Sequence, residues 1–371
     1  MSERLTRLRI AGYRSLRDVT VELGPLNVLI GANGAGKSNV ISFFKLLNEM
    51  MAGRLQQHIG ISGRAQSLLH FGPKHTSCLE AVLDLETDAG ARISHTMRLS
   101  PGDGDTLAFT QEILSGGANG PAPTLPVDLG QGHGETRLRA TADAGNEPAR
   151  SVRRLLDACH VYHFHDTSQL AAPRRAAYLQ DNHVLRHDAG NLASMLFAYR
   201  ARSPVVYRRI VSTLRQVMVE FDDFVLDPGG VNPNEIFLNW RAKGQDYVFG
   251  PHQLSDGSLR AMALMTLLLQ PEAEQPALMV LDEPELGLHP YALAIVAGLV
   301  QAAAVGSQVI VATQSPAFVD HFRASEVLVV DSQAHASRLR RLDDAELAGW
   351  LEDYSLGELW ERNVFGAGPM P

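Results

Sequence analysis

Residues 26–51 read "LNVLIGANGAGKSNVISFFKLLNEMM". The stretch opens with a short apolar run, passes through three glycines, and continues with apolar residues at helical spacing. The apolar run predicts a buried strand, and the later spacing predicts an amphipathic helix. The residues that set this spacing are Val40, Phe43, Phe44, Leu47, Met50 and Met51. A strand, a glycine-rich turn and a helix are therefore expected in direct succession.

The turn itself, "GANGAGKS" at 31–38, fits the pattern G-x-x-x-x-G-K-[ST] between a strand and a helix. Its glycines allow backbone N–H groups to surround phosphate oxygens, and the helix presents its positive end to the same anion. Lys37 is predicted to reach the β- and γ-phosphates of a nucleotide, and Ser38 to ligate Mg²⁺. The rest of the predicted nucleotide-binding loop is Gly31, Ala32, Asn33, Gly34, Ala35, Gly36 and Asn39. The alternative, a glycine turn with an incidental lysine, is disfavoured by the flanking strand and helix.

A second motif is the apolar run of "ALMVLDEPE" at 277–285, which leads into two carboxylates. A buried strand that ends in Asp282 places a carboxylate at its carboxyl end, where α/β proteins bind ligands. Asp282 is therefore predicted to hold Mg²⁺, directly or through water. Glu283 is predicted to act as general base on the attacking water. A solvated acidic turn is the alternative, and the phosphate loop in the same chain disfavours it.

The composition is that of an ordinary globular protein, with 371 residues, 45% hydrophobic residues and a formal charge of −8. Bulk charge therefore excludes a polycation, and nucleic-acid binding would need a local basic patch. Cys78 and Cys159 cannot build a disulfide framework, which favours a cytoplasmic setting. The N-terminus lacks the apolar core of a signal peptide. The uncharged stretch 286–319 is predicted to form a buried helix, a turn and a buried strand, and no membrane span.

The wider pattern predicts an α/β protein with a parallel sheet that is split by a long insertion, 56–249. Within it, residues 78–114 are expected to form antiparallel strands with a turn at "DAGA". Residues 115–150 are rich in Gly, Pro and Ala and predict a loop. Residues 184–222 predict helix, and "EIFLNW" with "DYVFG" predict a hairpin. From residue 254 onward, helices and buried strands alternate.

These motifs, in this order, resemble those of a known family. "GANGAGKS", "LSDGSLR", "VLDEPELGLHP" and "VATQSP" look like the Walker A, signature, Walker B with D-loop, and switch elements of an ABC-type ATPase head. The opening "LTRLRIAGYRSLRDVTVEL" resembles the first hairpin of the RecF and SMC-like branch. The closing "SLGELWERNVFGAGP" resembles the tail of small stand-alone bacterial AAA-family ATPases of this branch. The resemblance implies a P-loop NTPase of ABC-head type with an antiparallel β lobe and an inserted helical lobe.

The predicted domains follow from this resemblance. A discontinuous ATP-binding core is expected at 1–55 and 250–371. A β-rich lobe with the Gly/Pro-rich loop is expected at 56–170, and a helical lobe at 171–249.

The resemblance also implies a head-to-tail dimer with two ATP molecules between the subunits. The signature "LSDGSLR" would face the partner's γ-phosphate, where Ser255 can donate a hydrogen bond and Gly257 lets a phosphate approach the backbone. A simple helix cap at Ser255 is the alternative, and one serine can serve both purposes.

The same resemblance implies roles for further residues. The switch position usually holds histidine in this family, whereas this chain has Gln314, which can hold the attacking water but cannot titrate. Hydrolysis is therefore hypothesised to be slow or partner-dependent. Arg14 matches an arginine that lies near the phosphates in this branch, with a surface hairpin arginine as its alternative. Gly287 and His289 would form the D-loop that crosses to the partner subunit, and His289 is interpreted as structural rather than catalytic.

Two groups of residues each allow more than one interpretation. "HVYHFHDTSQ" places His163 and His165 on one face of a predicted strand, and it fits either a metal site or the Q-loop of the family. In the Q-loop interpretation, His165, Asp166 or Gln169 would contact Mg²⁺ or its water. Residues 184–220 carry six arginines and few acids, which fits a surface for DNA or a protein partner, or an ordinary solvated helix face.

The predicted function is a cytoplasmic, Mg²⁺-dependent ATP hydrolase that dimerises on ATP. The family association points to DNA repair, chromosome maintenance or anti-phage defence. The candidate partners are DNA and a separate effector protein, and no membrane is expected. The alternative is an ATP-gated clamp or sensor with little turnover that controls such an effector. The energising subunit of a transporter is disfavoured by the long insertion between Lys37 and Ser255.

Overall fold

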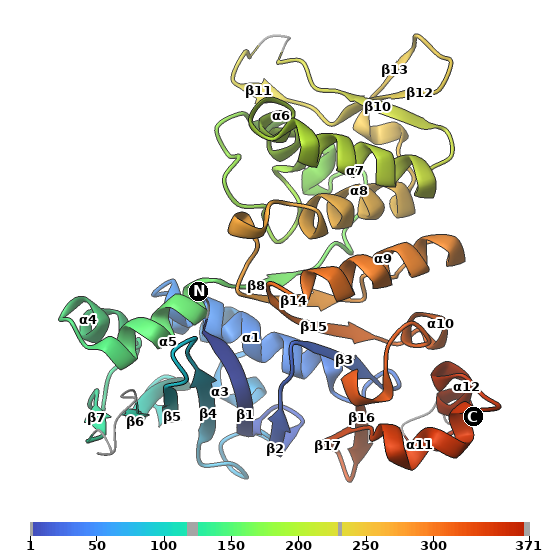
Figure 1. The fold of residues 1–371 in the computed structure, drawn as a ribbon. Coiled ribbons are helices and arrows are strands. Elements are labelled where there is room, and N and C mark those ends of the chain that lie inside the picture. The colour runs from blue at the N-terminus through green and yellow to red at the C-terminus, as the bar shows by residue number, and fades with distance from the viewer. Residues whose placement is uncertain (1–2, 117–124, 229–231, 367–371) are drawn as a thin grey trace. The chain divides into compact units, whose positions relative to one another are not determined.

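The computed structural model describes residues 3–116, 125–228 and 232–366 (Figure 1). The chain forms two compact units. Unit 1 comprises Met1–Val161, Pro276–Val280 and Gln308–Pro371. Unit 2 comprises Tyr162–Gln275 and Leu281–Ser307. The mixed α/β architecture agrees with the predicted fold class.

The central sheet of unit 1 is built around β3 (Leu26–Ile30), which is buried at every position. β3 pairs in parallel with β15 and with β16, and β17 pairs antiparallel with β16. The spatial order is β17 (Ala336–Arg341), β16 (Val327–Gln333), β3, β15 (Gln308–Thr313), β14 (Leu278–Asp282) and β8 (Cys159–Tyr162). The last residues of β14 and β8 belong to unit 2. The parallel pairing of β3 confirms the buried strand that its mainly apolar sequence predicts.

A second, antiparallel sheet makes up the β lobe of unit 1. Its order is β2 (Leu16–Glu22), β1 (Arg4–Tyr13), β4 (Leu79–Glu86), β5 (Arg92–Gly102), β6 (Thr106–Gly116) and β7 (Val127–Asp128). Buried and exposed residues alternate along β4, as expected for a strand with one face on the core. The predicted strands of 78–114 and the turn between β4 and β5 are confirmed.

Helix α1 (Lys37–Met51) contributes its apolar face to the core that both sheets of unit 1 share. Phe43 packs edge-to-face on Tyr13 of β1 with ring centroids 5.7 Å apart. This packing links the phosphate-loop helix to the antiparallel sheet. The other helices of unit 1 are α2 (Leu55–Ile61), α3 (Arg64–Leu68), α4 (Leu138–Asp143), α5 (Glu147–Asp157), α10 (Pro316–Val319), η4 (Ala324–Glu326), α11 (Asp344–Leu351) and α12 (Leu356–Glu361).

The loop predicted for residues 115–150 is wrong at its start, where Ser115 and Gly116 end β6, and at β7. It is also wrong over its second half, because α4 and the start of α5 lie there. The side chain of Asn146 caps α5 by accepting a hydrogen bond from the N–H of Ala149 at 2.9 Å. Val152 and Leu155 of α5 are buried in the core. The many glycine and alanine residues near the ends of α4 and α5 made the short apolar face of α5 hard to recognise in the sequence. Residues 117–124 of the predicted loop lie outside the described residues.

A buried carboxylate, Glu112 of β6, lies inside the β lobe. His95 Nε2 lies 3.2 Å from its Oε1, and the Thr136 hydroxyl donates to the same oxygen at 2.5 Å. Burial alone would raise the pKa of Glu112, but the hydrogen bonds from His95, Thr136 and the Arg137 backbone outweigh it and lower that pKa. The ionised carboxylate is therefore an integral part of the lobe.

We expect Glu112→Ala to lower the free energy of unfolding by about 3–5 kcal/mol at neutral pH. The reason is that His95, Thr136 and the N–H of Arg137 would lose their buried hydrogen-bond acceptor. Because the folded pKa is depressed, the contribution of Glu112 is complete above the unfolded value, about 4.3, and is lost as pH falls through the folded pKa. Urea unfolding at several pH values measures both effects. The exposed Glu86→Ala should change stability by less than about 0.5 kcal/mol. Equal stabilities of the two variants would refute the assignment.

Unit 2 is mainly helical. α8 packs against α6, α7 and α9. Its helices are η1 (Ala172–Arg174), α6 (Leu192–Arg202), α7 (Pro204–Val217), η2 (Pro251–Gln253), α8 (Asp256–Leu268), η3 (Glu272–Glu274) and α9 (Pro290–Ala303). A three-stranded sheet has the order β10 (Phe221–Val225), β12 (Asn239–Ala242) and β13 (Val248–Phe249), and β9 (Ala177–Tyr178) pairs with β11 (Glu235–Ile236). The β12–β13 pairing confirms the predicted hairpin from Asn239 onward, but Glu235 and Ile236 pair with β9 instead.

The helix predicted for 184–222 is confirmed for α6 and α7 but wrong for residues 184–191, which form turns, and for residues 218–222, which form a turn and the start of β10. The buried side chain of Asn191 holds these turns together. It accepts from the N–H of Arg186 at 2.9 Å and donates to the carbonyl of Val184 at 2.8 Å. Such side chain–backbone bonds compete with helix formation, which explains the difference.

No helix in the described part of the chain is long and apolar enough to cross a membrane. The uncharged stretch 286–319 forms α9, a turn and β15, as predicted. Both cysteines are free, and burial raises the pKa of Cys159 to about 12.

Candidate functional site

The phosphate loop of unit 1 connects β3 directly to α1, the context that the motif requires. Gly36 at the helix start has a φ of 116°, and a Cβ there would lie 1.9 Å from Ser337 Oγ. Only glycine fits this position. The buried side chain of Lys37 folds back over the loop, and its Nζ donates to the carbonyls of Gly31 at 2.5 Å and Ala32 at 3.2 Å. The loop is therefore preformed around its lysine.

The hydroxyl groups of Ser15 and Ser337 connect the loop by hydrogen bonds to the β1–β2 turn and to β17. Ser337 Oγ donates to the carbonyl of Ala35 at 2.7 Å and lies 2.6 Å from Ser15 Oγ. Asn39 Nδ2 donates to Ser15 Oγ at 2.6 Å. Ser15 follows Arg14 in the β1–β2 turn, and Arg14 has a left-handed φ of 49°. The structure thus brings the turn that carries Arg14 beside the phosphate loop.

Gln314, the predicted switch residue, directly follows β15. β15 is parallel to β3, and Thr313 lies opposite Ile30. Gln314 therefore leaves the sheet at the same edge as Gly31, the first residue of the phosphate loop. Its side chain is half-buried.

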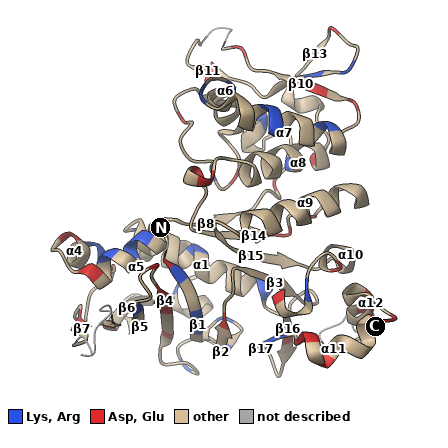
Figure 2. Ribbon diagram, viewed as in Figure 1, with Lys and Arg blue, Asp and Glu red and all other residues tan. Residues whose placement is uncertain are grey.

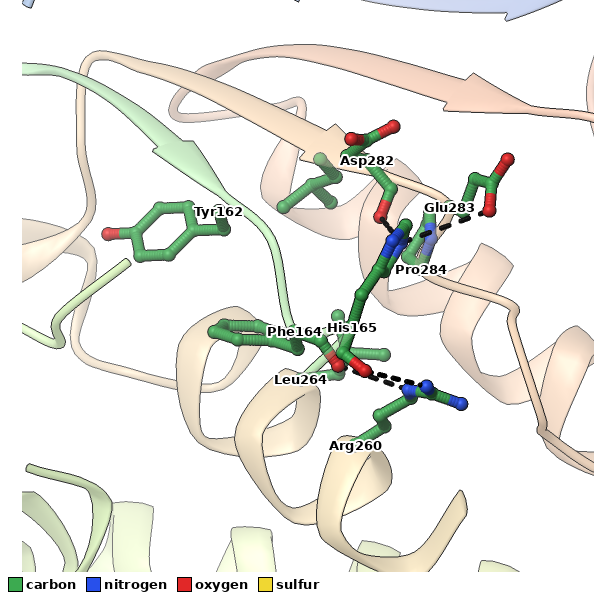
Figure 3. Close-up of a pocket in the computed structure, with 9 residues that line it drawn as sticks. Tyr162, Phe164, His165, Arg260, Leu264, Asp282, Glu283 and Pro284 are labelled. Atoms are coloured by element: carbon green, nitrogen blue, oxygen red, sulfur yellow. Dashed lines mark hydrogen bonds and ion pairs between the residues drawn. The ribbon is translucent and has the colours of Figure 1, made fainter. Parts of the chain in front are cut away.

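The two acidic candidates lie in unit 2, at the end of β14. Glu283 follows Asp282 with a φ of 44°, a left-handed conformation that is rare outside glycine and often marks functional sites. His163 Nδ1 lies 2.8 Å from Asp282 Oδ2. His165 Nε2 donates to the backbone carbonyl of Asp282 at 3.1 Å and lies 3.9 Å from Glu283 Oε2. Figure 3 shows His165 directed toward both acidic residues.

The prediction that His163 and His165 share a strand face is wrong, because β8 ends at Tyr162. The irregular backbone beyond it still places the two rings side by side, with centroids 3.8 Å apart. Burial, and then the neighbouring His163, lowers the pKa of His165. The other Q-loop candidates point elsewhere: Asp166 accepts from the N–H of Ser168 at 3.0 Å, and Gln169 is exposed.

Arg260 of α8 binds three backbone carbonyls, and its role was not predicted. It donates to Phe164 at 3.0 Å, to His165 at 3.0 Å and to Leu286 at 3.1 Å. Figure 3 shows the guanidinium reaching the first two of these carbonyls. Arg260 closes the signature "LSDGSLR". This one side chain therefore connects the signature helix, the 163–165 segment and the segment after Glu283.

Arg174 is a second arginine that the sequence did not single out. Its side chain is only 3% exposed. It donates to the carbonyls of Pro251 at 2.6 Å, Leu254 at 3.1 Å and Thr167 at 3.0 Å. It therefore fixes the turn that immediately precedes Ser255.

The signature segment begins at the N-terminus of α8. Ser255 is exposed, and its Oγ accepts from the N–H of Ser258 at 3.1 Å, so the capping role is present. A Cβ at Gly257 would lie 2.4 Å from the carbonyl oxygen of Gly287. The backbones of the signature and D-loop segments thus pack directly on each other. This close contact explains within one chain why residue 257 is a glycine. His289 caps α9 by accepting from the N–H of Tyr291 at 3.3 Å, in agreement with a structural role.

We expect Arg260→Ala to lower kcat by about 10–10²-fold, because the displaced 163–165 and 286 segments flank the acidic residues. The affinity for ATP should change little, since Lys37 lies in unit 1. Arg260→Lys should rescue only in part, because a lysine cannot reproduce the planar fork. Steady-state kinetics measures kcat, and a separate titration measures the affinity for ATP. The exposed Arg209→Ala is the control, and equal kcat values for both variants would contradict this role.

Three of the six arginines in the arginine-rich segment of unit 2 pair with acids. Arg200 lies 3.5 Å from Asp227, and Arg215 lies 3.0 Å from Asp222. Arg186 lies near two more aspartates. Figure 2 shows acidic residues among the basic ones in this part of the chain. This pairing favours the solvated-face interpretation over a dedicated DNA surface.

Comparisons with known proteins bear on the family and the fold of this chain. The family model "AAA domain, putative AbiEii toxin, Type IV TA system" matches residues 144–320, and the model "AAA ATPase domain" matches residues 4–67. The fold is similar to an Smc head bound to the C-winged helix domain of ScpA, at 15% identity and a TM-score of 0.60, covering 92% of this chain and 99% of that one. It is also similar to the Smc head with an extended coiled coil, bound to the C-terminal domain of ScpA, derived from Pyrococcus furiosus. That match has 14% identity and a TM-score of 0.60, and covers 95% and 99% of the two chains. No curated protein matches the chain significantly in sequence.

The fold is therefore that of a P-loop NTPase of the ABC-ATPase-head type. Together with this fold, the two family models, which match separate parts of the chain, support an ATP-binding ATPase.

Proposed function

We propose that this chain is a Mg²⁺-dependent ATP hydrolase that forms a head-to-tail dimer with two composite ATP sites. The observation that carries the proposal is the exposed Ser255 at the N-terminus of α8, on a turn that buried Arg174 holds rigid. A helix N-terminus with an outward hydroxyl suits the γ-phosphate of an ATP bound to a second copy. Gly257 and the D-loop glycine Gly287 would border the same face.

The first half of each site would be the phosphate loop. Residues 31–36 and Asn39 would surround the phosphates with backbone N–H groups, and Lys37 would bind the β- and γ-phosphates. Arg14 would add a permanent positive charge beside them. The contacts of Ser15 with Asn39 and Ser337 support this placement, since they hold the Arg14 turn against the loop.

Ser38 and Asp282 would hold Mg²⁺. An exposed hydroxyl on the first turn of α1 and a half-buried carboxylate are the hard oxygen donors that this ion prefers. When bound, Mg²⁺ neutralises negative charge on the phosphates.

Glu283 would accept a proton from the attacking water, and the Gln314 amide would orient that water. The left-handed backbone of Glu283 supports this role, since such strain persists only where the surrounding structure fixes it. Gln314 cannot titrate, so slow or partner-dependent turnover is part of the proposal.

The biological role is proposed on the family resemblance: DNA repair, chromosome maintenance or anti-phage defence in the cytoplasm. ATP would act as the ligand that favours the closed dimer, which would engage DNA or a separate effector. The domains proposed for this cycle remain a core at 1–55 and 250–371, a β-rich lobe at 56–170 and a helical lobe at 171–249. The low-turnover clamp is the alternative.

The test is ATPase activity per chain across protein concentration, with and without duplex and single-stranded DNA. A composite site predicts that activity per chain rises with concentration before it saturates. Constant activity per chain, with no ATP-dependent association, would contradict the dimer. ATP-dependent dimers with negligible turnover would support the clamp instead.

A further inference from the structure

Two imidazoles and a carboxylate meet in unit 2, at the end of β14. One ligand atom each from His163, His165 and Asp282 lies within 4.8 Å of the other two. All three side chains are partly accessible, with side-chain exposures of 38%, 25% and 13%. Of these three residues, only Asp282 takes part in the proposed Mg²⁺ site.

We propose that His163, His165 and Asp282 form a binding site for a transition-metal ion of the Zn²⁺ class. The ligand set is two imidazole nitrogens and one carboxylate oxygen, a combination that Zn²⁺ and related ions prefer. Mg²⁺ prefers oxygen ligands, so this set discriminates against the ion proposed for ATP.

The geometry needs a moderate adjustment. In a tetrahedral Zn²⁺ site with bonds of about 2.0–2.2 Å, two ligand atoms lie about 3.3–3.6 Å apart. The three ligand atoms lie within 4.8 Å of one another, so the longest separation must close by at most about 1.5 Å, which side-chain rotations can supply. His163 Nδ1 already lies 2.8 Å from Asp282 Oδ2, and a metal ion would take the place of this hydrogen bond.

The backbone that carries the histidines is fixed from two directions. The N–H of His163 donates to the carbonyl of His187 at 3.2 Å. Arg260 binds the carbonyls of Phe164 and His165, each at 3.0 Å. Binding sites gain affinity when their supporting contacts preorganise the ligands, and here these contacts are present without the ion.

The site has a regulatory consequence, which rests on the proposed function. Asp282 cannot serve two metal ions in full, so Zn²⁺ at the histidines would compete with the arrangement needed for Mg²⁺·ATP. Low concentrations of Zn²⁺ should therefore inhibit ATP hydrolysis by the wild-type chain, and His163→Ala should weaken the inhibition.

The direct test is titration of the full-length, nucleotide-free chain with Co²⁺, a Zn²⁺ substitute whose visible absorption reports its ligands. We expect saturation at about one ion per chain, displacement by Zn²⁺, and an affinity at least about tenfold lower in His163→Ala and in His165→Ala. The matched control is His183→Ala, an exposed histidine of the same unit, which should bind as the wild type does.

Two further variants keep the outcome interpretable. Lys37→Ala should bind Co²⁺ normally even though it loses ATP, so failure of the nucleotide site and failure of the metal site are distinguishable. His163→Gln, of similar size, and circular dichroism guard against misfolding. Unchanged Co²⁺ affinity in a folded His163→Ala/His165→Ala chain would overturn the proposal, as would an absence of saturable binding in the wild type.

Discussion

Glu283→Gln should reduce ATP turnover by about 10²–10⁴-fold while the chain still binds ATP. Glutamine keeps the size of the side chain and removes its ability to take a proton from water. His165, 3.9 Å from the carboxylate, and the left-handed backbone of Glu283 should hold the amide in nearly the same place. The ATP-bound state would no longer be consumed, so ATP-dependent dimers should accumulate.

Light scattering after size-exclusion chromatography, with ATP in the buffer, measures this accumulation alongside the rate of phosphate release. Glu272→Gln is the matched control, an exposed glutamate in the same unit, and should hydrolyse ATP at the wild-type rate. A Glu283→Gln chain that turns over normally would remove Glu283 from the chemistry. One that is inactive but stays monomeric with ATP would count against ATP-driven dimerisation.

Lys37→Ala should weaken ATP binding by about 10²-fold or more, because it removes charge-assisted hydrogen bonds to the phosphates. Lys37 Nζ donates to the carbonyls of Gly31 and Ala32, so its head group lies in the loop. Isothermal titration with a non-hydrolysable ATP analogue measures the change.

Lys45→Ala, later on the same helix, serves as the control and should bind the analogue normally. Thermal unfolding of both variants checks that the loop and α1 remain folded. Equal affinity in the two variants would show that the phosphate loop is not the nucleotide site.

The sequence could predict the parts of this molecule whose pattern is local. The apolar run of β3, the glycines and the helical spacing of α1 are adjacent in the chain, and their structure matches the prediction. The same holds for Ser255, whose cap bond reaches only to Ser258. Strand alternation likewise revealed the antiparallel lobe.

Contacts between distant residues could not be predicted in this way. Arg260 binds the carbonyls of Phe164 and His165, 96 and 95 residues away. Arg174 binds the carbonyl of Leu254 from 80 residues away. Every residue type carries a backbone carbonyl, so the sequence does not show which carbonyls these two arginines bind. The His163–Asp282 contact was hidden for a similar reason, since 119 residues separate its partners.

The composite dimer is tested most directly by mixing two inactive chains. Ser255→Arg places a bulky cation at the exposed signature and should bind ATP without dimerising or hydrolysing it. Lys37→Ala should fail to bind ATP but offers an intact signature. Random pairing in an equal mixture would give heterodimers with one complete site each, and up to about a quarter of the wild-type activity per chain. A mixture that stays as inactive as its two components would contradict the account.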